Sequence, residues 1–280
     1  MLFLTKFPKR NAWGKRFLIG EYLNNIWQSG LDLLFPSPAL CSICGRKLSI
    51  GALLGLCQSC LEHMPWVGAV FCQLCGRPLA IRQRPSGEAR CSDCTRTQHF
   101  FVRNRAIGIY TGSLKEQIQE LKYRYNRQLG IDLGQIMGLV AKHRQWVPKT
   151  AHLLAVPLYA ERLRQRGYNQ AELLLDGLQD FLQVPALEPG TVIRRSATGA
   201  SSHLGPRARR ANLQGVFQVP RPGQVAGKVL CVIDDIYTTG ATLDELTRTL
   251  LQAGAQEVYG LTLSIAVDEQ DLLGHGPSFD

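Results

Sequence analysis

Residues 228–242 read Lys-Val-Leu-Cys-Val-Ile-Asp-Asp-Ile-Tyr-Thr-Thr-Gly-Ala-Thr. The run up to Ile233 is almost wholly apolar, which predicts a buried strand of a parallel sheet, and the segment after Gly240 predicts a helix. Ligands of open parallel sheets bind at the carboxyl ends of strands. A Gly/Thr loop that runs into a helix offers amide groups, hydroxyls and the positive helix end to a phosphate. The residues expected to hold this phosphate are Thr238, Thr239, Gly240, Ala241 and Thr242.

The two acids that end the predicted strand, Asp234 and Asp235, suit another part of the same ligand. Carboxylates do not contact a phosphate favourably, so we expect them to face hydroxyl groups beside it, either a sugar diol or a group bound to Mg²⁺. The segment therefore specifies a ligand that carries a phosphate and a ribose. The alternative is an ordinary strand, turn and helix whose polar residues only face solvent.

Strands and helices alternate on the N-terminal and C-terminal sides of this segment. The predicted strands cover residues 106–110, 151–156, 228–233 and 258–265, and the predicted helices cover 113–123, 129–145, 169–183 and 241–253. Such alternation predicts an α/β fold, a parallel sheet with helices on both faces. Cys231, inside an apolar strand, is expected to be a core residue.

Eight of the nine cysteines form four C-x-x-C pairs ahead of this region. The pairs are Cys41/Cys44, Cys57/Cys60, Cys72/Cys75 and Cys91/Cys94. Two thiolates three residues apart on a tight turn point at one ion, and in a reducing compartment zinc is the natural metal. Four sulfur ligands at each site leave no open coordination position, which predicts two structural zinc ions. Redox-active C-x-x-C motifs, the alternative, would need a βαβ context that this stretch lacks.

An internal repeat bears on which cysteines share an ion. The hexapeptide Cys41-Ser-Ile-Cys-Gly-Arg46 recurs as Cys72-Gln-Leu-Cys-Gly-Arg77. The repeat favours sequential pairing, with the first two C-x-x-C pairs on one ion and the last two on the other. Interleaved pairing, first with third and second with fourth, uses the same ligands and stays open.

Composition and charge limit the class of protein. The 280 residues, 45% of them hydrophobic, are enough for about two domains with a buried core. The net charge of +10 is concentrated before residue 106, where zinc-bound thiolates would lower it. No window has the roughly 18 consecutive apolar residues of a membrane helix, and the first residues lack the pattern of a secretory signal. We expect a cytoplasmic protein with no membrane span.

Several motifs, together with the eight cysteines, resemble the ComF/GntX family over about residues 31–266. They are Leu31-Asp-Leu-Leu-Phe-Pro36, Leu121-Lys122-Tyr123, Val156-Pro157, Arg162-Leu-Arg-Gln-Arg166-Gly167-Tyr-Asn169-Gln170, Arg210-Ala-Asn212 and the segment 234–242. The resemblance implies a double zinc ribbon, a type I phosphoribosyltransferase-like domain, and a role in natural competence and the use of external DNA. The domains it implies are an N-terminal extension at 1–30, the double zinc-ribbon region at 31–101, the phosphoribosyltransferase-like domain at 102–267 and a flexible tail at 268–280.

The resemblance also implies roles for single residues. Asp234 and Asp235 would hold the ribose hydroxyls of phosphoribosyl diphosphate (PRPP), which binds with Mg²⁺, and Thr238–Thr242 would hold its 5′-phosphate. Residues 196–205 would form a mobile hood over the diphosphate, and Asn169 and Gln170 would fix the loop before the next helix. The cations implied at the diphosphate are Lys122, Arg162, Arg166, Arg194 and Arg210.

Two main classes of function follow. In the first, the protein is a phosphoribosyltransferase in which a nitrogen nucleophile attacks C1 of the ribose, and nothing in the sequence identifies the acceptor. In the second, it is a competence factor that binds single-stranded nucleic acid, or recombination or DNA-uptake proteins, without turnover. The arginines and aromatic residues expected on that nucleic-acid surface are Arg77, Arg82, Arg84, Arg90, Arg96, Phe100 and Phe101. A structural adaptor whose zinc region only docks a partner is a third class.

Overall fold

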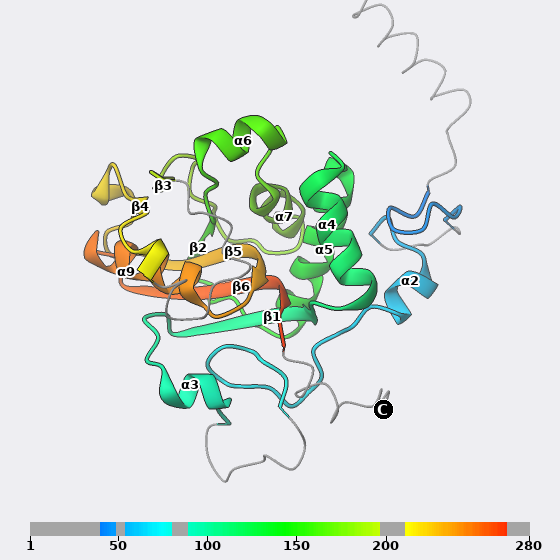
Figure 1. Ribbon diagram of the computed structural model, residues 1–280, viewed down its shortest axis with the longest axis horizontal. Coiled ribbons are helices and arrows are strands. Elements are labelled where there is room, and N and C mark those ends of the chain that lie inside the picture. Colours follow the sequence, from blue (N-terminus) through cyan, green and yellow to red (C-terminus); the bar gives the residue numbers. More distant parts are fainter. Residues whose placement is uncertain (1–39, 49–53, 80–88, 197–210, 268–280) are drawn as a thin grey trace, which may run out of the picture. The chain divides into compact units, whose positions relative to one another are not determined.

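The structure is a computed structural model that describes residues 40–48, 54–79, 89–196 and 211–267. Four strands form one parallel sheet. They are β1 (Arg103–Ile109), β2 (Ala151–Ala155), β5 (Val229–Tyr237) and β6 (Glu257–Ile265). The strands lie in the order β1-β6-β5-β2 (Figure 1). The α/β class with a parallel sheet is therefore confirmed.

Helices connect the parallel strands, as the crossover between parallel neighbours requires. The long ones are α4 (Gly112–Tyr123), α5 (Arg127–His143), α7 (Gln170–Gln179) and α9 (Ala241–Gln252). The shorter elements are α2 (Gln58–Glu62), α3 (Ser92–Arg96), α6 (Ala160–Arg166), the 3₁₀ turn η3 (Pro222–Gln224) and the antiparallel pair β3 (Ile193–Arg194) and β4 (Phe217–Gln218). No helix among the described residues combines the length and the apolar character needed to cross a membrane.

The sheet is covered on both faces, and each face buries its own apolar cluster. Leu153 and Ile233 belong to the cluster formed with α4, α5 and α7, whereas Leu154 and Val232 belong to the cluster formed with α9. Successive strand residues point to opposite faces, so a sheet covered on both sides needs almost continuously apolar strands. Cys231 is 1% exposed in the first of these clusters, as its sequence context predicts.

Strand β5 runs further than the sequence predicts. It continues through both acids to Tyr237 instead of ending at them. The neighbouring strand β6 is equally long and pairs Asp234 with Thr262 and Ile236 with Ser264. Because β6 supplies backbone partners along this stretch, Asp234 and Asp235 remain part of strand β5. The loop for which phosphate binding is predicted therefore begins at Thr238.

The cysteine region packs on the sheet domain, and the described residues from Cys41 onward form one compact unit. The backbone of residues 65–67 runs antiparallel to β1: the Ile109 amide donates to the Pro65 carbonyl at 2.7 Å, and the Val67 amide donates to the Ile107 carbonyl at 3.0 Å. An uncovered edge strand would present unpaired backbone groups. This segment covers that edge of the sheet.

Candidate functional site

The eight paired cysteines form two clusters of four. The first consists of Cys41, Cys44, Cys57 and Cys60, and the second of Cys72, Cys75, Cys91 and Cys94. The sequential pairing favoured by the repeat is therefore confirmed. All four cysteines of the second cluster are buried, but only one of the first is. The second cluster consequently forms part of the apolar core on the α9 side of the sheet.

The sulfur atoms have the spacing that zinc requires. With zinc–sulfur bonds of about 2.3 Å in a tetrahedral site, neighbouring sulfurs lie about 3.8 Å apart. The Sγ atoms of Cys44 and Cys57 are 3.7 Å apart, and those of Cys75 and Cys91 are also 3.7 Å apart. All the cysteines are free thiols and none is in a disulfide. The residues therefore fit two structural zinc ions, each with four sulfur ligands.

The loop between β5 and α9 has the geometry of an anion site. Gly240 is the N-cap of α9, with φ +75°. A Cβ there would lie 2.4 Å from the Tyr237 hydroxyl, so the position accepts no larger residue without a shift. The first amides of a helix have no partner within the helix, and the positive end of the helix dipole lies there. Residues Asp234, Thr238, Gly240 and Thr242 line a small pocket at this loop.

The two acids have different surroundings. Asp235 is 5% exposed, and its Oδ2 lies 2.6 Å from Lys122 Nζ and 3.4 Å from Gln170 Nε2. Asp234 lines the loop pocket, and its Oδ1 accepts the Asp235 amide at 2.8 Å. Burial, followed by the charge of Asp235, raises the pKa of Asp234 to about 8. Thus Asp234 faces the loop between β5 and α9, while Asp235 is held by an ion pair.

Lys122 was predicted to contact the diphosphate, and in the structure its ammonium is bound to Asp235. Burial alone would lower the pKa of Lys122, but the charge of Asp235 and its hydrogen bond outweigh burial and raise this pKa. The lysine therefore stays charged. A ligand that draws Lys122 away would leave Asp235 without its ion-pair partner.

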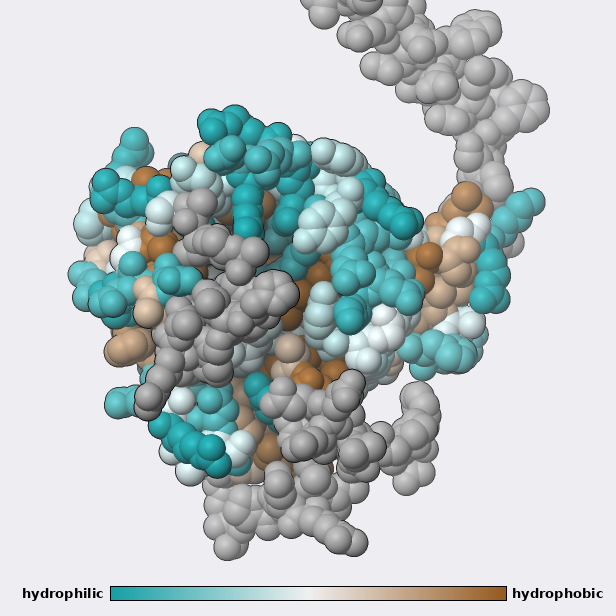
Figure 2. All heavy atoms as spheres, viewed as in Figure 1, coloured by the Kyte–Doolittle hydropathy of each residue, from teal (hydrophilic) through white to brown (hydrophobic). Residues whose placement is uncertain are grey.

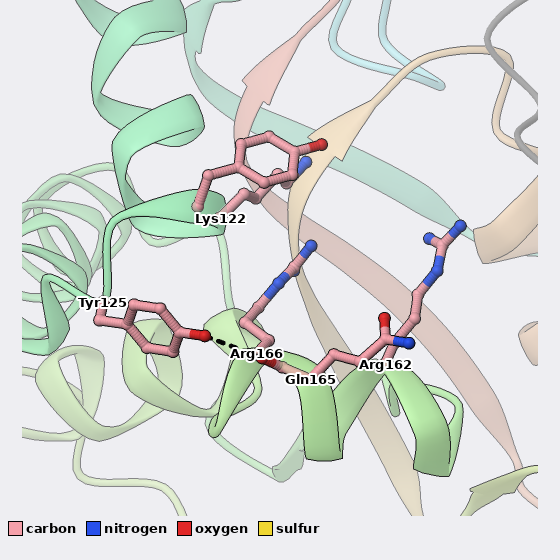
Figure 3. A pocket seen from close by; sticks show the side chains of 6 residues that line it. Lys122, Tyr125, Arg162, Gln165 and Arg166 are labelled. Atoms are coloured by element: carbon pink, nitrogen blue, oxygen red, sulfur yellow. Dashed lines mark hydrogen bonds between the residues drawn. The ribbon is translucent and has the colours of Figure 1, made fainter.

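Three of the predicted diphosphate cations line one pocket. It has a volume of about 320 Å³ and lies between the end of α4 and the helix α6. Figure 3 shows Arg162 and Arg166 extending from α6 on the side of the pocket where Lys122 lies. Hydrophilic side chains gather over α6 on the face seen in Figure 2. The lining residues are Lys122, Tyr123, Tyr125, Arg162, Gln165 and Arg166.

The junction between α6 and α7 joins this pocket to the acids. Asn169 caps α7 by accepting the Ala171 amide at 3.1 Å, and its Nδ2 donates to the Val156 carbonyl at 3.0 Å. This side chain therefore fixes the loop, as predicted. Gln170 accepts from Arg166 and donates to Asp235. A chain of polar contacts thus runs from Arg166 through Gln170 to the acid.

The remaining predicted residues have different outcomes. Burial lowers the pKa of Arg194, the charge of Arg162 lowers it further, and Asp234 opposes both effects, so Arg194 lies in the same charged region. Phe101 is only 3% exposed, and its ring lies 4.8 Å from that of His99, so it is a core residue and offers no open stacking face. The residues that lie outside the described part are Arg82, Arg84 and Arg210, together with nearly all of the hood at 196–205.

Tyr123 and Tyr125 line the pocket, a role that the sequence analysis did not predict. They are 73% and 66% exposed, and the Tyr125 hydroxyl donates to the Gln165 carbonyl at 2.9 Å (Figure 3). The guanidinium of Arg166 lies 5.9 Å from the Tyr123 ring centroid. A sequence signal for these two pocket residues does exist. Tyrosine and arginine alternate in the run Tyr123-Arg124-Tyr125, at the end of α4.

A family model matches the zinc region of this chain, and similar proteins match most of its length. The family model of the double zinc ribbon domain matches residues 30–95. The DNA utilization protein YhgH of Salmonella typhi is 29% identical over 224 residues, which cover 79% of this chain and 94% of that protein. Competence protein F of Haemophilus influenzae is 28% identical over 224 residues (78% and 93%), and competence protein ComFC of Bacillus subtilis is 29% identical over 219 residues (74% and 83%).

Two solved structures match a little over half of this chain. The allosteric regulatory enzyme of purine biosynthesis is 18% identical, with a TM-score of 0.32, over 54% of this chain and 38% of that one. Hypoxanthine phosphoribosyltransferase from Trypanosoma cruzi is 14% identical, with a TM-score of 0.29, over 58% of this chain and 73% of that one.

The sheet, the loop after β5 and the two cysteine clusters define a class of protein in which a double zinc ribbon precedes a parallel α/β domain. Relatives from three bacterial genera match along most of their own lengths and are named for competence or DNA utilization. The chain is thus similar, over most of its length, to proteins named for competence and DNA utilization, in line with the resemblance to the ComF/GntX family.

Proposed function

We propose that this protein binds PRPP or a related phosphoribosyl ligand, with the 5′-phosphate on the loop Thr238–Thr242. The observation that carries the proposal is the Gly240 turn, which has a positive φ, opens a 12-residue helix and lines a pocket beside Asp234. Helix N-termini with threonine hydroxyls favour phosphate, and the neighbouring carboxyl suits a sugar hydroxyl. The ribose would then lie over Asp234, between the loop and the cations of α4 and α6.

The diphosphate of the ligand would lie toward the pocket of Lys122, Arg162 and Arg166. Three cations in one pocket favour a group with several negative oxygens. Mg²⁺ would accompany the diphosphate, and the oxygen ligands of Asp234 and Asp235 suit this hard cation. Bound Mg²⁺ would neutralise charge on the leaving group. Because Asp235 is paired with Lys122, we expect ligand binding to rearrange this ion pair.

As an enzyme, the protein would transfer the phosphoribosyl group. A nitrogen nucleophile would attack C1 of the ribose, and the bond from C1 to the diphosphate oxygen would break with its electron pair on the diphosphate. The arginines of α6 would stabilise the charge that develops on the leaving group. The Asp234 carboxyl would hold the ribose hydroxyls while C1 gains positive character. The relatives are named for DNA utilization and competence, and in this proposal the activity serves the same role in this protein. The reduced cysteines suit the cytoplasm.

Binding of single-stranded nucleic acid without turnover is a second candidate. The observation that favours it is the exposure of Tyr123 and Tyr125 beside the arginines of α6, because bases stack on aromatic rings next to cations. Phe100 is also 54% exposed next to the zinc region. Such binding would weaken steeply as the salt concentration rises. Binding of oligonucleotides that does not depend on salt would contradict this candidate.

The test of the phosphoribosyl proposal is calorimetric titration of the zinc-replete protein with PRPP in the presence of Mg²⁺. The double variant Thr238→Val/Thr242→Val removes two hydroxyls at a partly exposed loop, and we expect it to bind about 100-fold more weakly than wild type. Thr150→Val is the control, because Thr150 is exposed and precedes β2, at the amino ends of the parallel strands, whereas the tested loop follows the carboxyl end of β5. Equal affinity of the double variant and wild type, or no binding by wild type, would contradict the proposal.

A further inference from the structure

The two halves of the internal repeat place their equivalent arginines differently. In the first half, Arg46 is exposed, and its side chain forms a hydrogen bond with the neighbouring Cys44 of its own ribbon. In the second half, the Nη2 of Arg77 donates to the Thr238 carbonyl at 3.4 Å. One arginine therefore stays with its own ribbon. The other reaches the first residue of the phosphate loop.

The second ribbon is fixed firmly enough to position Arg77. Gly76 has φ +83°, and a Cβ there would lie 3.1 Å from the Asn104 carbonyl oxygen, so the turn lies directly against β1. Asn104 is fully buried and donates from its Nδ2 to the Cys75 carbonyl at 3.0 Å. Its backbone amide donates to the Leu74 carbonyl at 2.7 Å. By contrast, nothing lies within 4 Å of a Cβ placed on Gly45 in the first ribbon.

Residues 99–101, which follow the second ribbon, contact the two elements on either side of the loop that contains Thr238, namely β5 and α9. The His99 side chain is fully buried, and its Nδ1 lies 2.7 Å from Asp244 Oδ2 in the first turn of α9. The Phe100 amide donates to the other oxygen of Asp244 at 3.1 Å. Phe101 meets the Tyr237 ring edge-on at 6.2 Å. The second ribbon and the residues after it thus contact both the start of the loop and the start of the helix.

The hydroxyl of Tyr237, at the end of β5, is buried without a hydrogen-bond partner among the described residues. Tyr237 as a whole is 3% exposed. This side chain lines the pocket together with Thr238 and Gly240. Buried hydroxyls are nearly always paired, so a ligand or a water is expected beside it.

We propose that Arg77 is a positioning residue of the phosphate loop. Its guanidinium holds the Thr238 carbonyl and brings a positive charge of the second zinc ribbon to the 5′-phosphate of the ligand. The inference rests on the proposed function, and it deepens that function by making one ribbon, and not the other, a part of the binding site. The zinc region is then more than a separate docking module.

The experiment measures binding of ribose 5-phosphate to wild type, Arg77→Ala, Arg77→Lys and Arg46→Ala by calorimetry, with two zinc ions per chain verified by native mass spectrometry. We expect about tenfold weaker binding by Arg77→Ala, since one charge-assisted contact is lost. We expect partial recovery in Arg77→Lys and unchanged binding by Arg46→Ala. Binding of Mg²⁺-pyrophosphate should not change in Arg77→Ala, because its proposed cations lie on α4 and α6. A merely structural effect would weaken both ligands.

The outcomes separate this inference from the proposed function. If wild type binds ribose 5-phosphate and Arg77→Ala binds it equally well, the role of Arg77 is overturned and the phosphate loop stands. If Arg77→Ala and Arg46→Ala weaken binding equally, a general charge effect replaces the proposed positioning. If wild type does not bind ribose 5-phosphate, the proposed function fails, and the inference fails with it.

Discussion

Replacing Asp234 with asparagine should make the protein more stable in alkaline solution, and this gain should shrink as the pH falls. Burial raises the pKa of the Asp234 carboxyl to about 8, with the charge of Asp235 as the next contribution. In the unfolded chain an aspartate titrates near pH 3.9. Between these two values the folded protein holds a proton that the unfolded chain has lost. The stability due to this proton is complete below about pH 4 and is lost as the pH rises through about 8.

The magnitude follows from the same two values. Each pH unit between them costs the wild-type protein about 1.4 kcal/mol, and the loss stops once the folded carboxyl is ionised. From pH 6 to pH 9 the free energy of unfolding of wild type should therefore fall by about 3 kcal/mol relative to that of Asp234→Asn. Asparagine has nearly the same shape and no charge at any pH, so the variant lacks this loss.

Urea unfolding of the two zinc-replete proteins at pH 6, 7.5 and 9 measures the difference. Asp235→Asn is the matched control, because it removes the charge that holds Lys122 and should destabilise the protein across this range. Parallel stability profiles of wild type and Asp234→Asn would refute the reasoning, since the carboxyl would then titrate alike in the folded and unfolded chains.

Three further predictions concern single side chains. Lys122→Met leaves the Asp235 carboxylate buried without its partner and should cost about 3 kcal/mol in urea unfolding, with much of the loss recovered when Asp235→Asn is added; additive losses would contradict the ion pair. Gly240→Ala should cost about 3 kcal/mol, since its Cβ meets the Tyr237 hydroxyl, whereas Gly223→Ala, with open space around it, should cost little; equal losses would argue against a strained loop. Cys75→Ser should leave one zinc per chain by mass spectrometry and lower the melting temperature of the whole domain, because this cysteine is part of the core; an unchanged melting temperature would contradict that packing.

The sequence predicted the elements that have strong periodicity. The apolar strand before Asp234, the glycine turn and the amphipathic helix α9 each carry a local signal, and the structure contains all three. Helix α6 was missed because none of its residues is buried, so no apolar stripe marks it. The end of β5 was misplaced because the partner strand that keeps the acids in the ladder lies elsewhere in the chain.

The residues of the candidate site could be predicted from the sequence, but the contacts between them could not. The cations Lys122, Arg162 and Arg166 were expected together and line one pocket. The ion pair of Lys122 with Asp235 depends on how α4 packs against β5, which no local pattern encodes. Likewise, the repeat makes the two ribbon arginines equivalent in sequence. Only the fold brings Arg77 to Thr238, at the start of the loop between β5 and α9.

A crystal structure of the zinc-replete protein soaked with PRPP and Mg²⁺ tests the central claim most directly. The account predicts the 5′-phosphate on the amides and hydroxyls of Thr238–Thr242, with the ribose over Asp234 and the diphosphate toward Arg162 and Arg166. A phosphate bound elsewhere, with this loop facing only water at saturating ligand, would contradict it.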